Sequence, residues 1–107
     1  MGITIISEDG CFEWDMDKNK RNKKDHGLFL SEILPAFDDP FLLEYYDETH
    51  STHNETRFKS LAELQDSIIL FLSYTEQSNG RTRIISARLA EPIEEKNYHE
   101  WRKSFVT

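Results

Sequence analysis

The sequence predicts an α+β domain in which a mainly antiparallel sheet of four or slightly more strands carries helices near both chain ends. A length of 107 residues gives room for one hydrophobic core. The 37% hydrophobic and 12% aromatic content argues against disorder, although 31% of the residues are charged. Short apolar runs separated by turn residues fill the middle of the chain. We therefore expect one domain over residues 1–107, with residues 1–10 as an N-terminal extension or an edge strand.

Helix signals follow a first short strand. Cys11-Phe12-Glu13-Trp14 alternates polar and apolar residues as a strand does, and Asp15 is a suitable N-cap for a helix. Residues 16–26 are almost wholly polar, and Gly27 suits the position after a helix end. An exposed helix over residues 16–26, suited to recognition more than to packing, is expected.

The next segment favours a short helix and then a hairpin. Residues 29–34 suit a short helix that Pro35 limits, and Asp38-Asp39-Pro40 is typical of a turn. A strand, a polar connection and a returning strand are expected at residues 41–46, 47–54 and 56–61.

The last third of the sequence predicts the central strands of the sheet and a helix that packs on them. Residues 67–74 are too continuously apolar for a half-exposed strand and indicate a central strand covered on both faces. Asn79-Gly80 is a turn signal, so residues 81–89 should pair antiparallel with that strand. Pro92 suits the first turn of a final helix that covers the sheet with an apolar stripe of Tyr98, Trp101 and Phe105. Trp14 and Trp101 are expected to pack in the core.

Charge and cysteine content bound the function classes. A net charge of −7 repels polyanions at long range, so any RNA binding must depend on local cationic patches. A single cysteine, Cys11, cannot form an intramolecular disulfide, which favours the cytoplasm. No apolar run approaches the roughly 20 residues needed to cross a bilayer, and residues 1–7 do not resemble a signal peptide. A cytoplasmic protein with no membrane association is expected.

A series of short motifs occurs in a fixed order along the chain. The motifs are Phe12-Glu13-Trp14-Asp15 with Lys18, Asn22, His26 and Gly27; Phe37-Asp38-Asp39-Pro40; Asp47-Glu48-Thr49-His50; Glu55-Thr56-Arg57-Phe58; Tyr74-Thr75; Arg83-Ile84-Ile85-Ser86-Ala87-Arg88; and Tyr98. This series resembles the BrnT family, the toxin half of a bacterial type II toxin–antitoxin pair. The resemblance implies a RelE-like fold, an endoribonuclease that inhibits translation without a metal or other cofactor, and neutralisation by a BrnA-like antitoxin. DNA would be reached only through that antitoxin.

Metal-free RNA cleavage makes a 2′-oxygen attack its neighbouring phosphate, which needs a proton acceptor, a proton donor and cations. Arginine suits the last task because its planar fork binds phosphate at two points. The strand expected at residues 81–89 offers Arg81, Arg83 and Arg88, but alternation places Arg88 on the opposite face unless a bulge or a bend intervenes. Composition alone favours Arg81 and Arg83 as ordinary solvent-facing residues, whereas the resemblance favours Arg83 and Arg88 as functional.

Two further groups supply candidates. Lys18, Asn22 and His26 share one helix face, where they can address a phosphate and a ribose hydroxyl. His26 is either a general acid or a cap of the helix end, and the two roles are about equally favoured. In the polar connection, the family match makes Glu55 a possible base and Arg57 a phosphate ligand or a partner of Glu55.

The remaining candidates each have a plainer alternative. Asp47, His50, His53 and Glu55 suggest a metal site by residue type, but a flexible loop without thiolates favours solvated side chains. Tyr98 either packs in the core or reaches a substrate with its hydroxyl. The predicted catalytic set is His26, Glu55, Arg83, Arg88 and His50. The predicted RNA-binding set is Lys18, Asn22, Arg57, Arg81 and Tyr98, and no metal site is predicted.

Four positions depart from the family pattern. Asp25 stands where a lysine is usual and Gln77 where an arginine is common, and both changes remove positive charge. Ala62 and Ser67 replace glycines. The charge losses motivate an alternative function, a catalytically weakened module that holds a DNA-binding antitoxin and regulates transcription.

Overall fold

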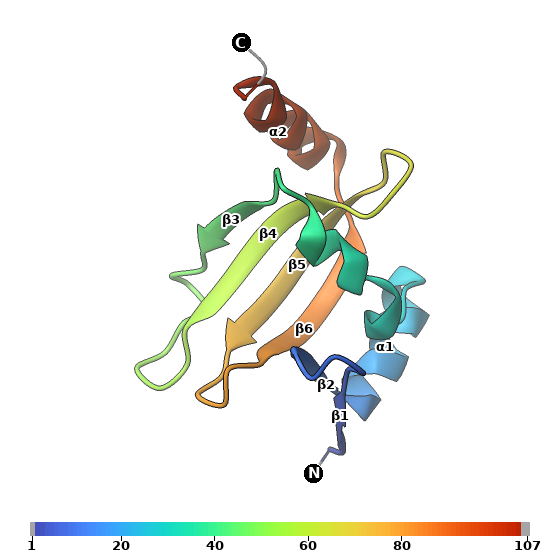
Figure 1. The fold of residues 1–107 in the computed structure, drawn as a ribbon, viewed down its shortest axis with the longest axis vertical. Coiled ribbons are helices and arrows are strands. Elements are labelled where there is room, and N and C mark those ends of the chain that lie inside the picture. Colours follow the sequence, from blue (N-terminus) through green and yellow to red (C-terminus); the bar gives the residue numbers. More distant parts are fainter. Residues whose placement is uncertain (1, 106–107) are drawn as a thin grey trace.

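The protein folds around one six-stranded sheet with strand order β1-β2-β6-β5-β4-β3 (Figure 1). A computed structural model describes residues 2–105. Its elements are β1 (Thr4–Ile6), β2 (Phe12–Asp15), α1 (Met16–His26), the 3₁₀ turns η1 (Leu30–Glu32) and η2 (Leu34–Asp38), β3 (Leu43–Tyr46), β4 (Arg57–Glu63), β5 (Ile69–Glu76), β6 (Thr82–Leu89) and α2 (Pro92–Lys103). The predicted α+β class, with a helix near each chain end, is confirmed.

The sheet is larger and more mixed than predicted. Four of the neighbouring pairs are antiparallel, including the predicted β3–β4 and β5–β6 hairpins, but β2 pairs with β6 in parallel. β1 then adds an edge strand through its antiparallel pairing with β2. The expectation of a mainly antiparallel sheet of four or slightly more strands is met only in part. The free edge of β6 accepts a parallel strand from the far end of the sequence, and alternation within a strand does not reveal its partner.

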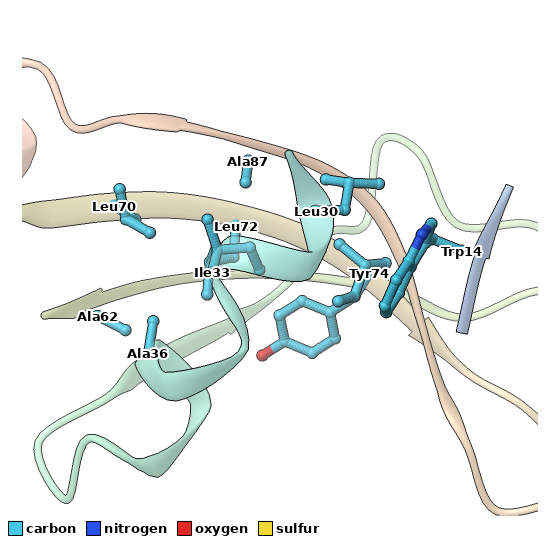
Figure 2. Packing of buried hydrophobic residues seen from close by; sticks show 10 residues of the cluster. Trp14, Leu30, Ile33, Ala36, Ala62, Leu70, Leu72, Tyr74 and Ala87 are labelled. Atoms are coloured by element: carbon cyan, nitrogen blue, oxygen red, sulfur yellow. The ribbon is translucent and has the colours of Figure 1, made fainter. Parts of the chain in front are cut away.

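One face of the sheet is covered by the segment of η1 and η2 (Figure 2). Leu30, Ile33 and Ala36 are completely buried against this face. Their spacing of three residues matches the 3₁₀ period, in which residues i and i+3 lie on one side. The predicted single helix over residues 29–34 is therefore two 3₁₀ turns, with Pro35 in the first turn of the second. The sheet contributes Trp14, Ala62, Leu70, Leu72, Tyr74, Ile84 and Ala87 to this core.

Helix α1 begins and ends at the predicted residues. The Asp15 carboxylate accepts a hydrogen bond from the Lys18 backbone N–H at 2.9 Å, and Gly27 adopts the left-handed conformation at φ 77°. Only Asn22 is buried among the helix residues. Its amide donates to the carbonyl oxygens of Leu28 and Ala87, both at 2.8 Å, and accepts from the Ala87 N–H at 3.0 Å. Asn22 thus supplies hydrogen-bond partners to the backbone of β6 along the part of its edge where no neighbouring strand pairs with it.

Helix α2 lies at one end of the sheet and covers only that end (Figure 1). Tyr98 is completely buried with Leu61, Ile69 and Ala90, but Trp101 is 38% and Phe105 55% exposed. The predicted stripe therefore packs only in part, because α2 follows the end of β6 and extends beyond the strands. On the face of β5 opposite the core, Ile69 is buried under α2 and Thr75 is buried among its neighbours, whereas Phe71 and Ser73 are part-exposed. The expectation of cover on both faces is therefore met only in part.

An ion pair fastens α2 to the sheet. Arg88 of β6 donates from both terminal nitrogens to the Glu94 carboxylate, at 2.8 and 3.0 Å. These bonds hold the pKa of Glu94 below its ordinary value of 4.5 against the opposing effect of burial. In the part of the chain that the structure describes, no helix is long and apolar enough to cross a membrane.

Replacing the buried amide by Asn22→Ala should lower the free energy of unfolding by about 3 kcal/mol, because it leaves the Ala87 N–H and C=O without partners. Urea unfolding followed by circular dichroism measures the loss. Lys20→Ala, an exposed change on the same helix, should cost little. Equal stability of the two variants would contradict the role assigned to Asn22.

The ion pair should make stability depend on pH. Because the folded-state pKa of Glu94 is lowered, its contribution is complete above pH 4.5 and is lost as the pH falls through the lowered pKa. We expect Glu94→Gln to cost about 1 kcal/mol at pH 7 and almost nothing at strongly acid pH. Urea unfolding of both proteins across this range checks the trend. Glu95→Gln, its exposed neighbour, is the control and should show no such trend.

Candidate functional site on the open sheet face

A bulge in β6 decides which side chains reach the uncovered face of the sheet. Ile84 pairs with Tyr74 and Ser86 with Ser73, so Ile85 is an extra residue in β6. Ile84 and Ala87 consequently both point into the core, with 1% and 0% exposure. The alternation of the strand is reset at the bulge, and Arg83 and Arg88 therefore lie on the same, open face.

Strand register arranges the open face in three transverse rows. The first row, across β2, β6, β5 and β4, contains Glu13, Arg83, Thr75 and Arg57. The second, across β6, β5, β4 and β3, contains Ser86, Ser73, Lys59 and Tyr45. The third contains Arg88, Phe71, Leu61 and Leu43, and α2 covers this end. The first two rows are free of any covering element among residues 2–105 and carry most of the polar groups.

A buried carboxylate anchors the first row. Glu13 is 6% exposed, forms an ion pair with Arg83, lies 3.9 Å from Arg81 and accepts from the Asn79 amide at 3.2 Å. Burial raises the pKa of Glu13, but these hydrogen bonds and the two arginine charges outweigh it and lower the pKa overall. Glu13 therefore stays ionised and holds Arg81 and Arg83 on one side of the sheet.

Each of the arginines predicted for RNA has a carboxylate partner. Arg57 contacts Glu55 at 3.0 Å, and Arg88 stacks on the Phe71 ring at 4.3 Å while both its terminal nitrogens bind Glu94. In contrast, the cations Lys18, Arg21 and Lys59 form no ion pair with residues 2–105. Lys59, in the middle of the open face, was missed from the sequence, although its spacing of two residues from Arg57 on one strand was the available signal.

A groove of about 280 Å³ runs along the open face beside the β3–β4 connection. Its lining residues are Asp47, His50, Arg57, Lys59, Phe71, Ser73, Ile85 and Ser86. The His50 Nδ1 lies 2.9 Å from the buried Asp47 carboxylate, which also accepts from the His50 backbone N–H at 3.2 Å. Although burial opposes it, these bonds lower the pKa of Asp47. With Nδ1–H donating to Asp47, the Nε2 of His50 is left to exchange a proton with a ligand.

A second hollow, of about 190 Å³, lies between α1 and β6 and meets the groove at Ile85 and Ser86. It is lined by Lys18, Arg21, Asn22, Asp25, His26, Ile85 and Ser86. The three residues predicted to share a helix face thus line one hollow, but the Asn22 amide is fully engaged by backbone groups. His26 and His50 stand on opposite sides of the β6 bulge.

Other predicted residues lie away from these hollows. Tyr98 is completely buried and donates to the Asp39 carboxylate at 2.6 Å, so the expected contact with RNA is not available to it. Glu55 is exposed and bound to Arg57 at the edge of the groove. Within residues 2–105 no three potential ligands gather in a metal-binding cluster.

Comparisons with known proteins identify the family. The family described as "Ribonuclease toxin, BrnT, of type II toxin-antitoxin system" matches residues 14–94, well over half of the chain. The crystal structure of the ribonuclease toxin BrnT from Brucella abortus superposes with a TM-score of 0.59 at 20% identity. That match covers 73% of this chain and 92% of the Brucella chain, and it supports the fold. No curated protein matches the chain. The resemblance read from the ordered motifs is thus confirmed, and the chain belongs to the BrnT family of ribonuclease toxins of type II toxin–antitoxin systems.

Proposed function

We propose that this BrnT-family protein is a metal-independent endoribonuclease of RelE-like architecture that cleaves RNA on the open sheet face and so inhibits translation. The observation that carries the proposal is the bulge at Ile85, because it puts Arg83 and Arg88 of β6 on the same uncovered face as Arg57 and Lys59 of β4. The groove beside His50 and the hollow beside His26 meet at that bulge. RNA lying across it would contact both histidines.

In the proposed reaction a 2′-hydroxyl oxygen attacks the adjacent phosphorus, and the bond from phosphorus to the 5′-oxygen of the next nucleotide breaks. The Nε2 of His50 takes the 2′-proton, and the Asp47 carboxylate stabilises the resulting imidazolium. A protonated His26 supplies the proton to the departing 5′-oxygen.

The proposal gives the two arginines of β6 different roles. Arg83 uses only Nη1 in its hydrogen bonds with residues 2–105, so Nε and Nη2 can bind a phosphate while Glu13 holds the side chain in place. Arg88 has both terminal nitrogens on Glu94 and braces α2. Arg57 and Lys59 complete the cationic surface around the phosphate, Lys18 binds a neighbouring phosphate, and Arg81 and Glu55 orient their partners.

The partner in this proposal is a BrnA-like antitoxin that neutralises the toxin and carries any contact with DNA. Membership of a type II toxin–antitoxin family supports an antitoxin partner. One observation favours the alternative function of an antitoxin-holding module. Each arginine that was predicted to act on RNA already forms an ion pair with a carboxylate of the protein.

Cleavage of labelled single-stranded RNA in the presence of EDTA tests the activity. Arg83→Ala should lower the initial rate by about 100-fold, since it removes a cation that stabilises the transition state. A 2′-deoxy substitution at the cleaved nucleotide should block cleavage there. Lys103→Ala, at the far end of α2, is a matched loss of one positive charge and should cleave like the unmodified protein.

Intact RNA with purified protein, or equal rates for Arg83→Ala and the unmodified protein, would sink the proposed reaction. Expression in bacteria separates the two functions. Growth arrest that a co-expressed antitoxin relieves supports the enzyme, whereas harmless expression with tight antitoxin binding supports the module.

His50→Ala should lower the cleavage rate by about 100-fold, because the groove loses its proton acceptor. RNA affinity, measured by fluorescence anisotropy, should change little. His53→Ala is the control, since this exposed histidine lies on the same connection outside the groove. An equal loss of cleavage rate in His50→Ala and His53→Ala would contradict the role of His50 as the acceptor of the 2′-proton.

A further inference from the structure

A third hollow lies where the open face meets α2, and we propose that it binds a guanine base of the RNA substrate next to the cleaved phosphate. This inference rests on the proposed function. The hollow has a volume of about 320 Å³ and is lined by Tyr45, Lys59, Leu61, Phe71, Glu94 and Asn97. Three of these lining residues, Tyr45, Glu94 and Asn97, take no part in the reaction proposed above.

The shape and lining of the hollow suit a flat ring. Tyr45 is 38% exposed on the edge strand β3, which leaves its ring accessible as a stacking surface, and Leu61 and Phe71 form an apolar floor. The Arg88 guanidinium already stacks on the Phe71 ring, 4.3 Å from the ring centroid. A base is therefore expected to stack on Tyr45, since base–aromatic stacking is a major source of single-strand affinity.

The polar groups at the rim distinguish one base from another. Glu94 and Asn97 lie three residues apart on α2 and hence on one side of the helix. The Glu94 carboxylate accepts three hydrogen bonds, two on Oε1 and one on Oε2, and so keeps room for one more on Oε2. The Asn97 side chain makes no hydrogen bond within residues 2–105 and is free to bind a ligand.

Guanine fits this set of groups best. Its N1–H and N2–H₂ donors can reach the Glu94 carboxylate and the Asn97 oxygen, and its O6 can accept from the Lys59 ammonium. Adenine would instead turn the N1 lone pair toward the carboxylate, so that two acceptors face each other with no donor between them. Lys59 has no carboxylate partner among the described residues, so its ammonium can serve both the base and the backbone phosphate.

The hollow is continuous with the cleavage groove. Lys59 and Phe71 line both, so a base held beside α2 places its own phosphate toward His50 and Arg57. The subsite therefore governs which nucleotide flanks the cleaved bond, and Lys59 is the one group that it shares with the cationic surface of the proposed reaction.

Direct binding of nucleotides tests the subsite without relying on cleavage. Titration of the whole chain with guanosine 3′-monophosphate, followed by NMR, should shift the backbone signals of β3 and the first turns of α2. We expect the adenosine, cytidine and uridine monophosphates to bind at least about 10-fold more weakly. Asn97→Ala should abolish the preference for guanosine. Tyr45→Ala should weaken the binding of guanosine 3′-monophosphate by about 10-fold, whereas Tyr45→Phe should keep the affinity of the unmodified protein. Asn54→Ala, an exposed asparagine away from α2, is the matched control.

Equal binding of the four nucleotides, or shifts confined to other parts of the protein, would overturn the guanine subsite. The cleavage pattern separates this inference from the proposed function. RNA cut without any base preference would refute the subsite and keep the ribonuclease. Selective binding of guanosine 3′-monophosphate by a protein that leaves RNA intact would keep the subsite and refute the reaction.

Discussion

The single extra residue in β6 is the constraint on which the functional face depends. In a regular strand Ile84 and Ala87, three positions apart, would point to opposite sides, and one of them would leave the core; the bulge at Ile85 absorbs the extra residue. With it, two apolar residues face inward and two arginines face outward. Asn22 then binds the backbone of Ala87 just beyond the bulge, so the irregular part of the strand is held by α1 instead of by another strand.

Local features of the fold were readable from the sequence, whereas long-range pairings were not. The cap at Asp15, the end of α1 at Gly27 and the β5–β6 turn follow from nearby residues and were predicted correctly. The parallel pairing of β2 with β6 joins segments about seventy positions apart, and no periodicity encodes it. The same distance separates Glu13 from Arg83, so the carboxylate that holds this arginine could not be predicted.

Candidate residues by type were easier to find than their roles. The open face contains Arg57 and Arg83, two of the residues predicted to act on RNA, and the ordered motifs led to the family. Whether these arginines can bind a phosphate depends on the carboxylates that the fold brings next to them. The protein carries a net charge of −7, and ion pairs with Glu55 and Glu13 hold Arg57 and Arg83 in place on the open face. Such pairs limit long-range attraction to polyanions and keep the guanidinium groups oriented.

The position of α2 gives one helix two tasks. It closes the minor hydrophobic cluster through Tyr98 and forms the wall of the hollow beside Tyr45. It lies at the periphery of the fold, where it packs on the ends of β4 and β5 and is joined to Arg88 by Glu94 and to Asp39 by Tyr98. Local opening of such a peripheral helix costs less free energy than global unfolding. A nucleotide bound between α2 and the sheet would bridge the two and suppress that opening, so substrate occupancy and the integrity of the C-terminal part of the chain are thermodynamically linked.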